Sequence, residues 1–258
     1  MNNIRVTLVN PDEIENLYTR WGSYARICYN SPEGRELFIG KGCHNTRHYS
    51  GSRTTYFIFH VENVSRCCTA QMNRTSIGCV INEKSMRYVD FSNAQFTIPP
   101  SIANNPEAMR VYNDITDYTK NGYKQLQDLL KLDGLYGENN NQDARYALSI
   151  GIQTEGMWGY ALESLEHLCH ERLCERAQWE IREVVKQMKK EVLKVMPELK
   201  DKLVSQCIAD GYCWQNKMQC DKFKDVILTK NEFDKLRKSD DWKSIVKNIK
   251  QTNNIRGV

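Results

Sequence analysis

Two long runs of helical periodicity constrain the fold of this sequence more than any other feature. The first opens at Asn105-Pro106, where asparagine can cap a helix and proline fits its first turn. Apolar or aromatic residues follow at helical spacing, at positions 109, 112, 115, 118, 123, 126, 129 and 130. The second run extends from about Gly156 to Met196 and is expected to be interrupted or bent once. Both patterns predict long helices.

Shorter segments predict strands. Residues 4–9, 55–61 and 87–98 have the β-branched, aromatic or extended character of strands, and the last segment is ended by Pro99-Pro100.

The remaining segments predict short helices and loops. Pro11 opens a helix, and Ser65 can cap another that continues to about Arg74. Residues 39–53 are rich in glycine and polar groups and predict a loop. A polar turn at 137–142 precedes a short helix around 144–148. No internal repeat or low-complexity linker is evident in the sequence, so we expect a single domain over residues 1–258.

The composition limits the class of protein and its ligands. The 258 residues include 26% charged and 10% aromatic residues, which is typical of a globular chain. A net charge of +4 suits a small anionic ligand but is too weak and dispersed to indicate binding of a nucleic-acid polymer. The sequence shows no signal-peptide core and no span of about 18 apolar residues. We therefore expect a cytoplasmic protein without a membrane segment, whose ten cysteines stay as thiols.

Several arginines occupy positions that the periodicity turns inward. Arg172 follows Leu168 and Cys169 by four and three residues, so it shares their apolar helix face. A buried guanidinium keeps its proton and needs an anionic or carbonyl partner. For Arg172 alone, an ion pair with a glutamate at 163, 166 or 180 is the more ordinary explanation. Arg74, Arg87 and Arg145 raise the same question, and four such residues together suit a phosphate and a carbonyl-rich base.

Two regions of the sequence are similar to motifs of one enzyme family. Residues 144–146 (Ala-Arg-Tyr) and 172–182 (Arg-Leu-Cys-Glu-Arg-Ala-Gln-Trp-Glu-Ile-Arg) closely resemble the back half of flavin-dependent thymidylate synthases. Upstream, residues 71–74 (Gln-Met-Asn-Arg) and 85–88 (Ser-Met-Arg-Tyr) resemble the signature region of that family, in which Gln-x-x-Arg leads into Ser-x-Arg-Tyr.

A third match lies near the C-terminus. Cys207, Cys213 and Cys220 are similar to a cysteine-bearing motif of many bacterial members. The matches together span roughly residues 55–220 in the family's order, and residues 221–258 lie outside them. The resemblance implies an α+β fold, an antiparallel sheet packed with long helices, and a homotetramer whose active sites are shared between subunits.

The resemblance also implies a substrate and a reaction. Members convert dUMP to dTMP with FAD, using methylenetetrahydrofolate as the one-carbon donor and NADPH as the reductant. The residues implied to bind dUMP are Gln71, Arg74, Ser85, Arg87, Arg145 and Arg172. Ser85 and Arg87 would hold the phosphate with help from Arg145, whereas Arg172 would reach the pyrimidine carbonyls and stabilise charge that develops there.

The implied flavin site differs from the usual family pattern. Its candidate residues here are Ser50, Arg74, Thr75, Ser76 and His167. The family has an Arg-His-Arg triplet where this sequence has Arg74-Thr75-Ser76, and one additional residue separates that triplet from Ser85. Two other functions therefore stay open: flavin-independent C5 chemistry, such as hydroxymethylation of dUMP or dCMP, and a non-catalytic nucleotide-binding subunit. The first of these needs a thiolate to activate the ring, for which Cys79 is the candidate, although a small residue filling a turn is the more ordinary explanation for it.

Two further groups contain possible metal ligands. His167, His170 and Cys174 fall on neighbouring turns of one predicted helix. His170 and Cys174 are one turn apart, but the sequence offers no convincing third ligand to complete a site with them. The three C-terminal cysteines suit zinc by residue type, but the sequence indicates no fourth ligand. We expect both groups to be structural and predict no metal site.

Overall fold

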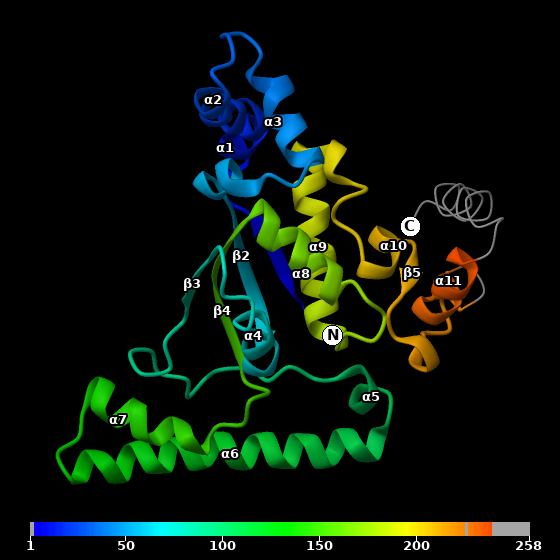
Figure 1. Ribbon diagram of the computed structural model, residues 1–258. Coiled ribbons are helices and arrows are strands. Elements are labelled where there is room, and N and C mark those ends of the chain that lie inside the picture. The colour runs from blue at the N-terminus through cyan, green and yellow to red at the C-terminus, as the bar shows by residue number, and fades with distance from the viewer. Residues whose placement is uncertain (1–2, 225–226, 239–258) are drawn as a thin grey trace. The chain divides into compact units, whose positions relative to one another are not determined.

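The computed structural model describes residues 3–224 and 227–238. The chain forms two compact units, each assembled from two separate stretches of sequence. Unit 1 contains the residues up to Val9 together with Ile58–Gly159, and unit 2 contains Asn10–Phe57 together with the chain from Tyr160 onward. Figure 1 labels most helices and strands of both units. No helix in the described part of the chain is long and apolar enough to cross a membrane.

A four-stranded sheet is the centre of unit 1. Its strands are β1 (Arg5–Leu8), β2 (Tyr56–Ser65), β3 (Cys79–Glu83) and β4 (Gln153–Ala161), in the spatial order β1-β2-β4-β3. β1 pairs antiparallel with β2, with Arg5 opposite Glu62. Alternate residues of β1 are buried, as expected of a strand with one face on the core.

The helices of unit 1 lie between the strands in the chain. They are α4 (Arg66–Met72), α5 (Pro100–Ala103), α6 (Pro106–Leu132) and α7 (Gly137–Ala144), and a 3₁₀ turn covers Arg145–Ala147. Helix α4 follows β2, and the other three follow β3. The C-terminal half of α6 lies beside α7 (Figure 1), where Gln127 on α6 accepts from Asn140 at 2.6 Å and donates to Asn141 at 2.8 Å. A core of Phe91, Tyr123, Ala144 and Ile152 anchors both helices.

Unit 2 is mainly helical. Its elements are α1 (Pro11–Glu15), α2 (Leu17–Tyr29), α3 (Glu36–Asn45), a 3₁₀ segment at Tyr49–Thr54, α8 (Leu162–Arg172), α9 (Trp179–Val195), 3₁₀ turns at Pro197–Leu199 and Asn216–Met218, α10 (Gln206–Asp210), β5 (Tyr212–Cys213), β6 (Leu228–Thr229) and α11 (Lys230–Arg237). The backbones of α2 and α3 approach closely through glycines. A Cβ added at Gly22 would lie 1.7 Å from the Glu36 carbonyl oxygen, and one at Gly40 would lie 2.0 Å from that of Tyr18.

The structure confirms the α+β class with an antiparallel sheet, the strand near the N-terminus and the long helix from Pro106. The predicted cap at Ser65 is also confirmed, because its Oγ accepts from the Cys68 amide at 3.0 Å, although α4 ends at Met72. The predicted interruption of the second helical run lies between α8 and α9.

Other predictions are wrong, and in two of them a glycine allows close packing of backbones where the pattern predicts a loop or a helix. The expected loop at 39–53 contains most of α3 and a 3₁₀ segment, and Gly40 serves close helix packing instead of a turn. The helix expected from Gly156 begins only at Leu162, because residues 153–161 form β4. A Cβ at Gly156 would lie 2.6 Å from the Asn82 carbonyl oxygen, so this glycine permits close approach within the sheet.

Two smaller errors concern a predicted strand and a predicted turn. The strand expected at 87–98 is mostly turns with one bridge between Phe96 and Ile152, and the nearby strand is β3, at Cys79–Glu83. The expected turn at 137–142 is α7, whose asparagines find partners on α6 and so tolerate burial. The expectation of a single domain stays a prediction.

Candidate active site

The segment that follows β2 carries the first candidate residues. Gln71 lies on α4, and its Nε2 donates to the Cys67 carbonyl at 3.5 Å. Arg74 follows the end of the helix in an exposed turn, so the prediction that it turns inward is wrong. Thr75 is buried, whereas Ser76 is exposed. The capped helix thus presents Gln71 and Arg74 from one short stretch of chain.

A tight turn after β3 holds Ser85 and Arg87. The Arg87 amide donates to the Ser85 Oγ at 3.2 Å. The guanidinium of Arg87 lies over the Tyr88 ring, 5.3 Å from its centroid, and its Nη2 contacts Glu138 at 3.2 Å. Its Nε is buried and has no hydrogen-bond partner. One ion pair therefore leaves part of this guanidinium unsatisfied, as expected of a group that binds a further acceptor.

Arg66 is a candidate that the sequence did not single out. Burial lowers the pKa of Arg66, the charge of Glu83 partly opposes this, and the charge of Arg145 lowers the pKa further. Its Nη1 pairs with Glu83 at 3.0 Å, and its Nη2 donates to the Lys84 carbonyl. Arg145 itself donates from Nε to the Gln142 carbonyl at 3.1 Å. Unit 1 therefore brings the positive charges of Arg66 and Arg145 near each other, and a bound anion would offset their repulsion.

Arg172 is the last residue of α8 in unit 2. Its side chain is 17% exposed, so the prediction that it turns inward is confirmed. One end, Nη2, lies 3.4 Å from Glu171, whereas Nε is buried without a partner. This ion pair joins Arg172 to its neighbour on the helix, not to a glutamate at 163, 166 or 180. Arg172 thus shares with Arg87 a guanidinium that is only partly satisfied.

The candidate flavin residues of unit 2 are exposed. Ser50 lies in the 3₁₀ segment, and His167 lies on α8 with its Nε2 3.6 Å from Glu171. Glu163 on the same helix forms an ion pair with Arg53, whose Nη2 and Nε donate at 2.6 and 3.1 Å. The carboxylate at this position is therefore charge-balanced within the chain.

A buried polar network lies in the same unit. His44 Nε2 contacts Glu166 Oε1 at 2.5 Å, and the Tyr49 hydroxyl donates to Oε2 at 2.5 Å. Because a carboxylate only accepts, Nε2 carries a proton, and Nδ1 forms a hydrogen bond of 2.7 Å with the Tyr18 hydroxyl. The network positions the Tyr49–Thr54 segment against α8. Periodicity gives no signal for it, since its members lie on four separate segments.

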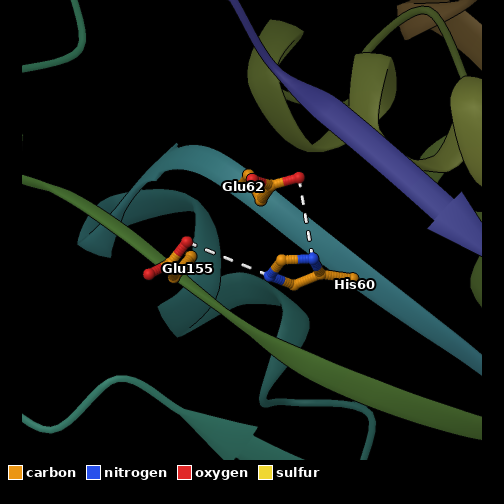
Figure 2. A group of neighbouring side chains, drawn as sticks. All are labelled: His60, Glu62 and Glu155. Carbon is orange, nitrogen blue, oxygen red and sulfur yellow. Dashed lines mark ion pairs between the residues drawn. The ribbon is translucent and has the colours of Figure 1, made fainter.

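Figure 2 shows a second polar group, with His60 and Glu62 on β2 and Glu155 on β4. Within the described ranges it is the only set of three potential ligand residues whose ligand atoms all lie within 4.8 Å. Each imidazole nitrogen faces a different carboxylate, at 3.6 and 3.9 Å. Glu62 pairs with Arg5, and Glu155 pairs with Lys84 at 2.6 Å. Since both carboxylates have cationic partners, this group is an ion-pair network at the sheet surface.

Comparison with known proteins places the chain in a family. The sequence profile of the family described as "Thymidylate synthase complementing protein" matches residues 14–198. The chain belongs to this family. A flavin-dependent thymidylate synthase of Nitratidesulfovibrio vulgaris is 34% identical over 166 residues, which cover 64% of this chain and 67% of the relative. One of Pyrococcus furiosus is 34% identical over 231 residues, covering 81% and 89%.

A solved structure shows the same fold. The crystal structure of thymidylate synthase X from Helicobacter pylori with FAD and dUMP aligns with a TM-score of 0.52 and 18% identity, over 78% of this chain and 99% of that chain. All the candidate substrate and flavin residues of this chain, from Ser50 to Arg172, lie inside the family match, whereas Cys207, Cys213 and Cys220 lie beyond it.

Proposed function

We propose that this protein converts dUMP to dTMP with FAD as cofactor, methylenetetrahydrofolate as one-carbon donor and NADPH as reductant. Family membership and the names of the relatives support this activity. The observation that carries it is the pair of partly satisfied guanidiniums, Arg87 and Arg172, each with a buried Nε that has no partner. Both residues stand in motifs of the resemblance, and a nucleotide offers the acceptors that they lack.

Different residues of the chain would bind different parts of dUMP. The Ser85–Arg87 turn would bind the phosphate, with Arg145 adding a second charge. Gln71 and Arg74 would approach the phosphate and sugar side. Arg172 would donate to the pyrimidine carbonyls and stabilise negative charge on the ring during the reaction.

The polar residues at the proposed flavin positions suit FAD. Ser50, Arg74, Ser76 and His167 are exposed and offer hydroxyl, guanidinium and imidazole donors of the kind that a diphosphate requires. The ion pair with Arg53 cancels the charge with which Glu163 would repel that diphosphate. Thr75 is buried and less suited to this role than its neighbours. Reduced FAD, when bound, supplies the hydride.

We also propose that the protein assembles as a homotetramer. The long helix α6 exposes large apolar side chains, namely Val111, Ile115, Tyr118, Leu126, Leu129 and Leu132. Tyr118 and Leu132 are more than 80% exposed. A contiguous apolar helix face of this kind is typical of a protein–protein interface.

Flavin absorbance and dUMP binding test the proposed function. Purified protein should bind FAD and dUMP, and Arg87→Ala should weaken dUMP binding at least about tenfold, because a hydrogen bond to a charged group contributes roughly 1.5–3 kcal/mol. Arg110→Ala is the matched control, since Arg110 lies on α6 in an exposed pair with Asp114. Unchanged dUMP affinity in the Arg87 variant contradicts the proposed site.

A colourless protein that binds dUMP but not FAD contradicts the flavin-dependent reaction. Cys79→Ala then separates the two remaining functions. Loss of turnover supports flavin-independent C5 transfer, and an inert wild-type protein supports a nucleotide-binding subunit.

A further inference from the structure

We propose that Cys174, Cys207, Cys213 and Cys220 form a tetrathiolate site for a zinc ion. All four belong to unit 2, and no disulfide links them. Three follow one another in the C-terminal segment, whereas Cys174 lies in the connection between α8 and α9. The fold thus supplies the fourth ligand that the spacing of the C-terminal cysteines lacks.

The three C-terminal thiols share one small cluster. Cys213 is buried with Phe223 and Ile227, and Cys207 and Cys220 pack against them. Between the first two thiols the chain reverses at Gly211, which has a φ of +79° and whose amide donates to the Cys207 carbonyl at 3.0 Å. A left-handed glycine at the end of α10 therefore returns Cys213 towards Cys207.

Two contacts bring the Cys174 segment to this cluster. Arg176 Nη1 donates to the Met218 carbonyl at 2.9 Å, and Glu175 Oε1 accepts from Lys222 Nζ at 3.1 Å. These contacts directly follow Cys174 on one segment and lie on both sides of Cys220 on the other. A cavity of about 200 Å³ is lined by residues close in sequence to three of the cysteines: Leu173, Glu175, Ser205, Ile208, Lys222 and Phe223.

Charge balance supports a cation among these thiols. The Ser205 hydroxyl lies 3.3 Å from the Cys207 sulfur, within reach of a thiolate there. Four thiolates held together repel one another, and a divalent cation removes that repulsion. Lys186, Lys189 and Lys222 line the cavity with Glu175 and offset the net negative charge of a zinc tetrathiolate.

The size of the local core also favours a metal. Among the residues that the structure describes, the cluster contains three buried ones, and β5 and β6 are two residues each. So small a core stabilises a segment poorly, and natural small folds add a metal or disulfides for this reason. Zinc is the ion of choice for four thiolates, since it prefers tetrahedral sulfur ligands.

Metal binding requires a local closure. The set His60, Glu62 and Glu155 is the only one within the described ranges that meets a 4.8 Å spacing of ligand atoms, so no three of the four sulfurs do. Zn–S bonds of about 2.3 Å place tetrahedral sulfurs about 3.8 Å apart. Side-chain rotation and a shift of the loop at 214–220 accomplish this approach.

The test is the metal content of full-length protein purified without chelators. We expect about one zinc ion per chain in the wild type and less than about a tenth of one in Cys174→Ser and Cys220→Ser, whose thiols are only half-buried. Cobalt reconstitution provides a second readout, because four thiolates give tetrahedral d–d bands and an intense thiolate-to-cobalt charge-transfer band that weakens with each ligand removed. Circular dichroism and dUMP binding confirm that the variants remain folded.

Three variants serve as controls that should retain zinc. Cys28→Ser removes an exposed thiol elsewhere, His170→Gln removes the imidazole one turn from Cys174, and His60→Ala removes the imidazole of the sheet-surface network. Wild-type protein without zinc, zinc retained in both cysteine variants, or iron with sulfide in place of zinc each overturns the proposal. Because dUMP and FAD binding are measured separately, failure here leaves the proposed enzyme activity intact.

Discussion

The carboxylate of Glu166 offers the sharpest test of what stabilises unit 2. It is 7% exposed and accepts from both His44 and Tyr49. Truncation by Glu166→Ala leaves two buried donors without an acceptor, at about 1–3 kcal/mol each. Because the cavity left by the shortened side chain adds to this cost, we expect a destabilisation of about 3–5 kcal/mol, a large fraction of a typical total of about 5–15 kcal/mol.

Urea unfolding followed by circular dichroism at one fixed protein concentration measures this destabilisation. Glu166→Gln should be intermediate, because its amide keeps one acceptor but sets an NH₂ group against a donor. Asp114→Ala is the control, since the Arg110–Asp114 pair is 67% and 68% exposed and should contribute less than about 0.5 kcal/mol. A cost below about 1 kcal/mol for Glu166→Ala would refute the assignment of this network as a buried, fully used set of hydrogen bonds.

Three further outcomes follow from burial and packing. Gly22→Ala should destabilise the protein severely in thermal unfolding because its Cβ would meet a backbone oxygen at 1.7 Å, whereas Gly42→Ala, with nothing within 4 Å, should not. Burial raises the pKa of Cys169 to about 12, so iodoacetamide at pH 8 should modify exposed Cys28 and spare Cys169 in native protein, as peptide mass spectrometry can show. Burial also raises the pKa of Tyr18, so its contribution to the free energy of unfolding is complete below the pKa of the unfolded chain, near 10. Above that pH the unfolded chain ionises first, and the free energy of unfolding falls by about 1.4 kcal/mol per pH unit. Tyr18→Phe removes this loss, so the stability of the variant should decline less steeply above pH 10.

Local features of the sequence predicted those parts of the fold whose causes are also local. Ser65 caps α4, and Asn105-Pro106 starts α6, because a cap depends on the residue and its next three neighbours. The inward turn of Arg172 follows from helical spacing alone. Family motifs added the candidate dUMP residues, which stay predictions at the level of each residue.

Glycine marks where this local reasoning failed. A glycine can be required where the chain turns or where another backbone comes close, and the sequence does not distinguish these two causes. Gly40 and Gly156 both raise this question. In both places the second cause applies, so a predicted loop is α3 and the start of a predicted helix is β4.

By itself, then, the sequence determined the long helix α6, the caps at Ser65 and Asn105 and the motifs of the thymidylate synthase complementing protein family. Only the tertiary structure decided which polar groups meet. Glu166 pairs with His44, 122 positions away, and Arg176 donates to the carbonyl of Met218, 42 positions away. Partners of this kind depend on which elements pack together, and helical or strand periodicity says which face is buried without saying what covers it.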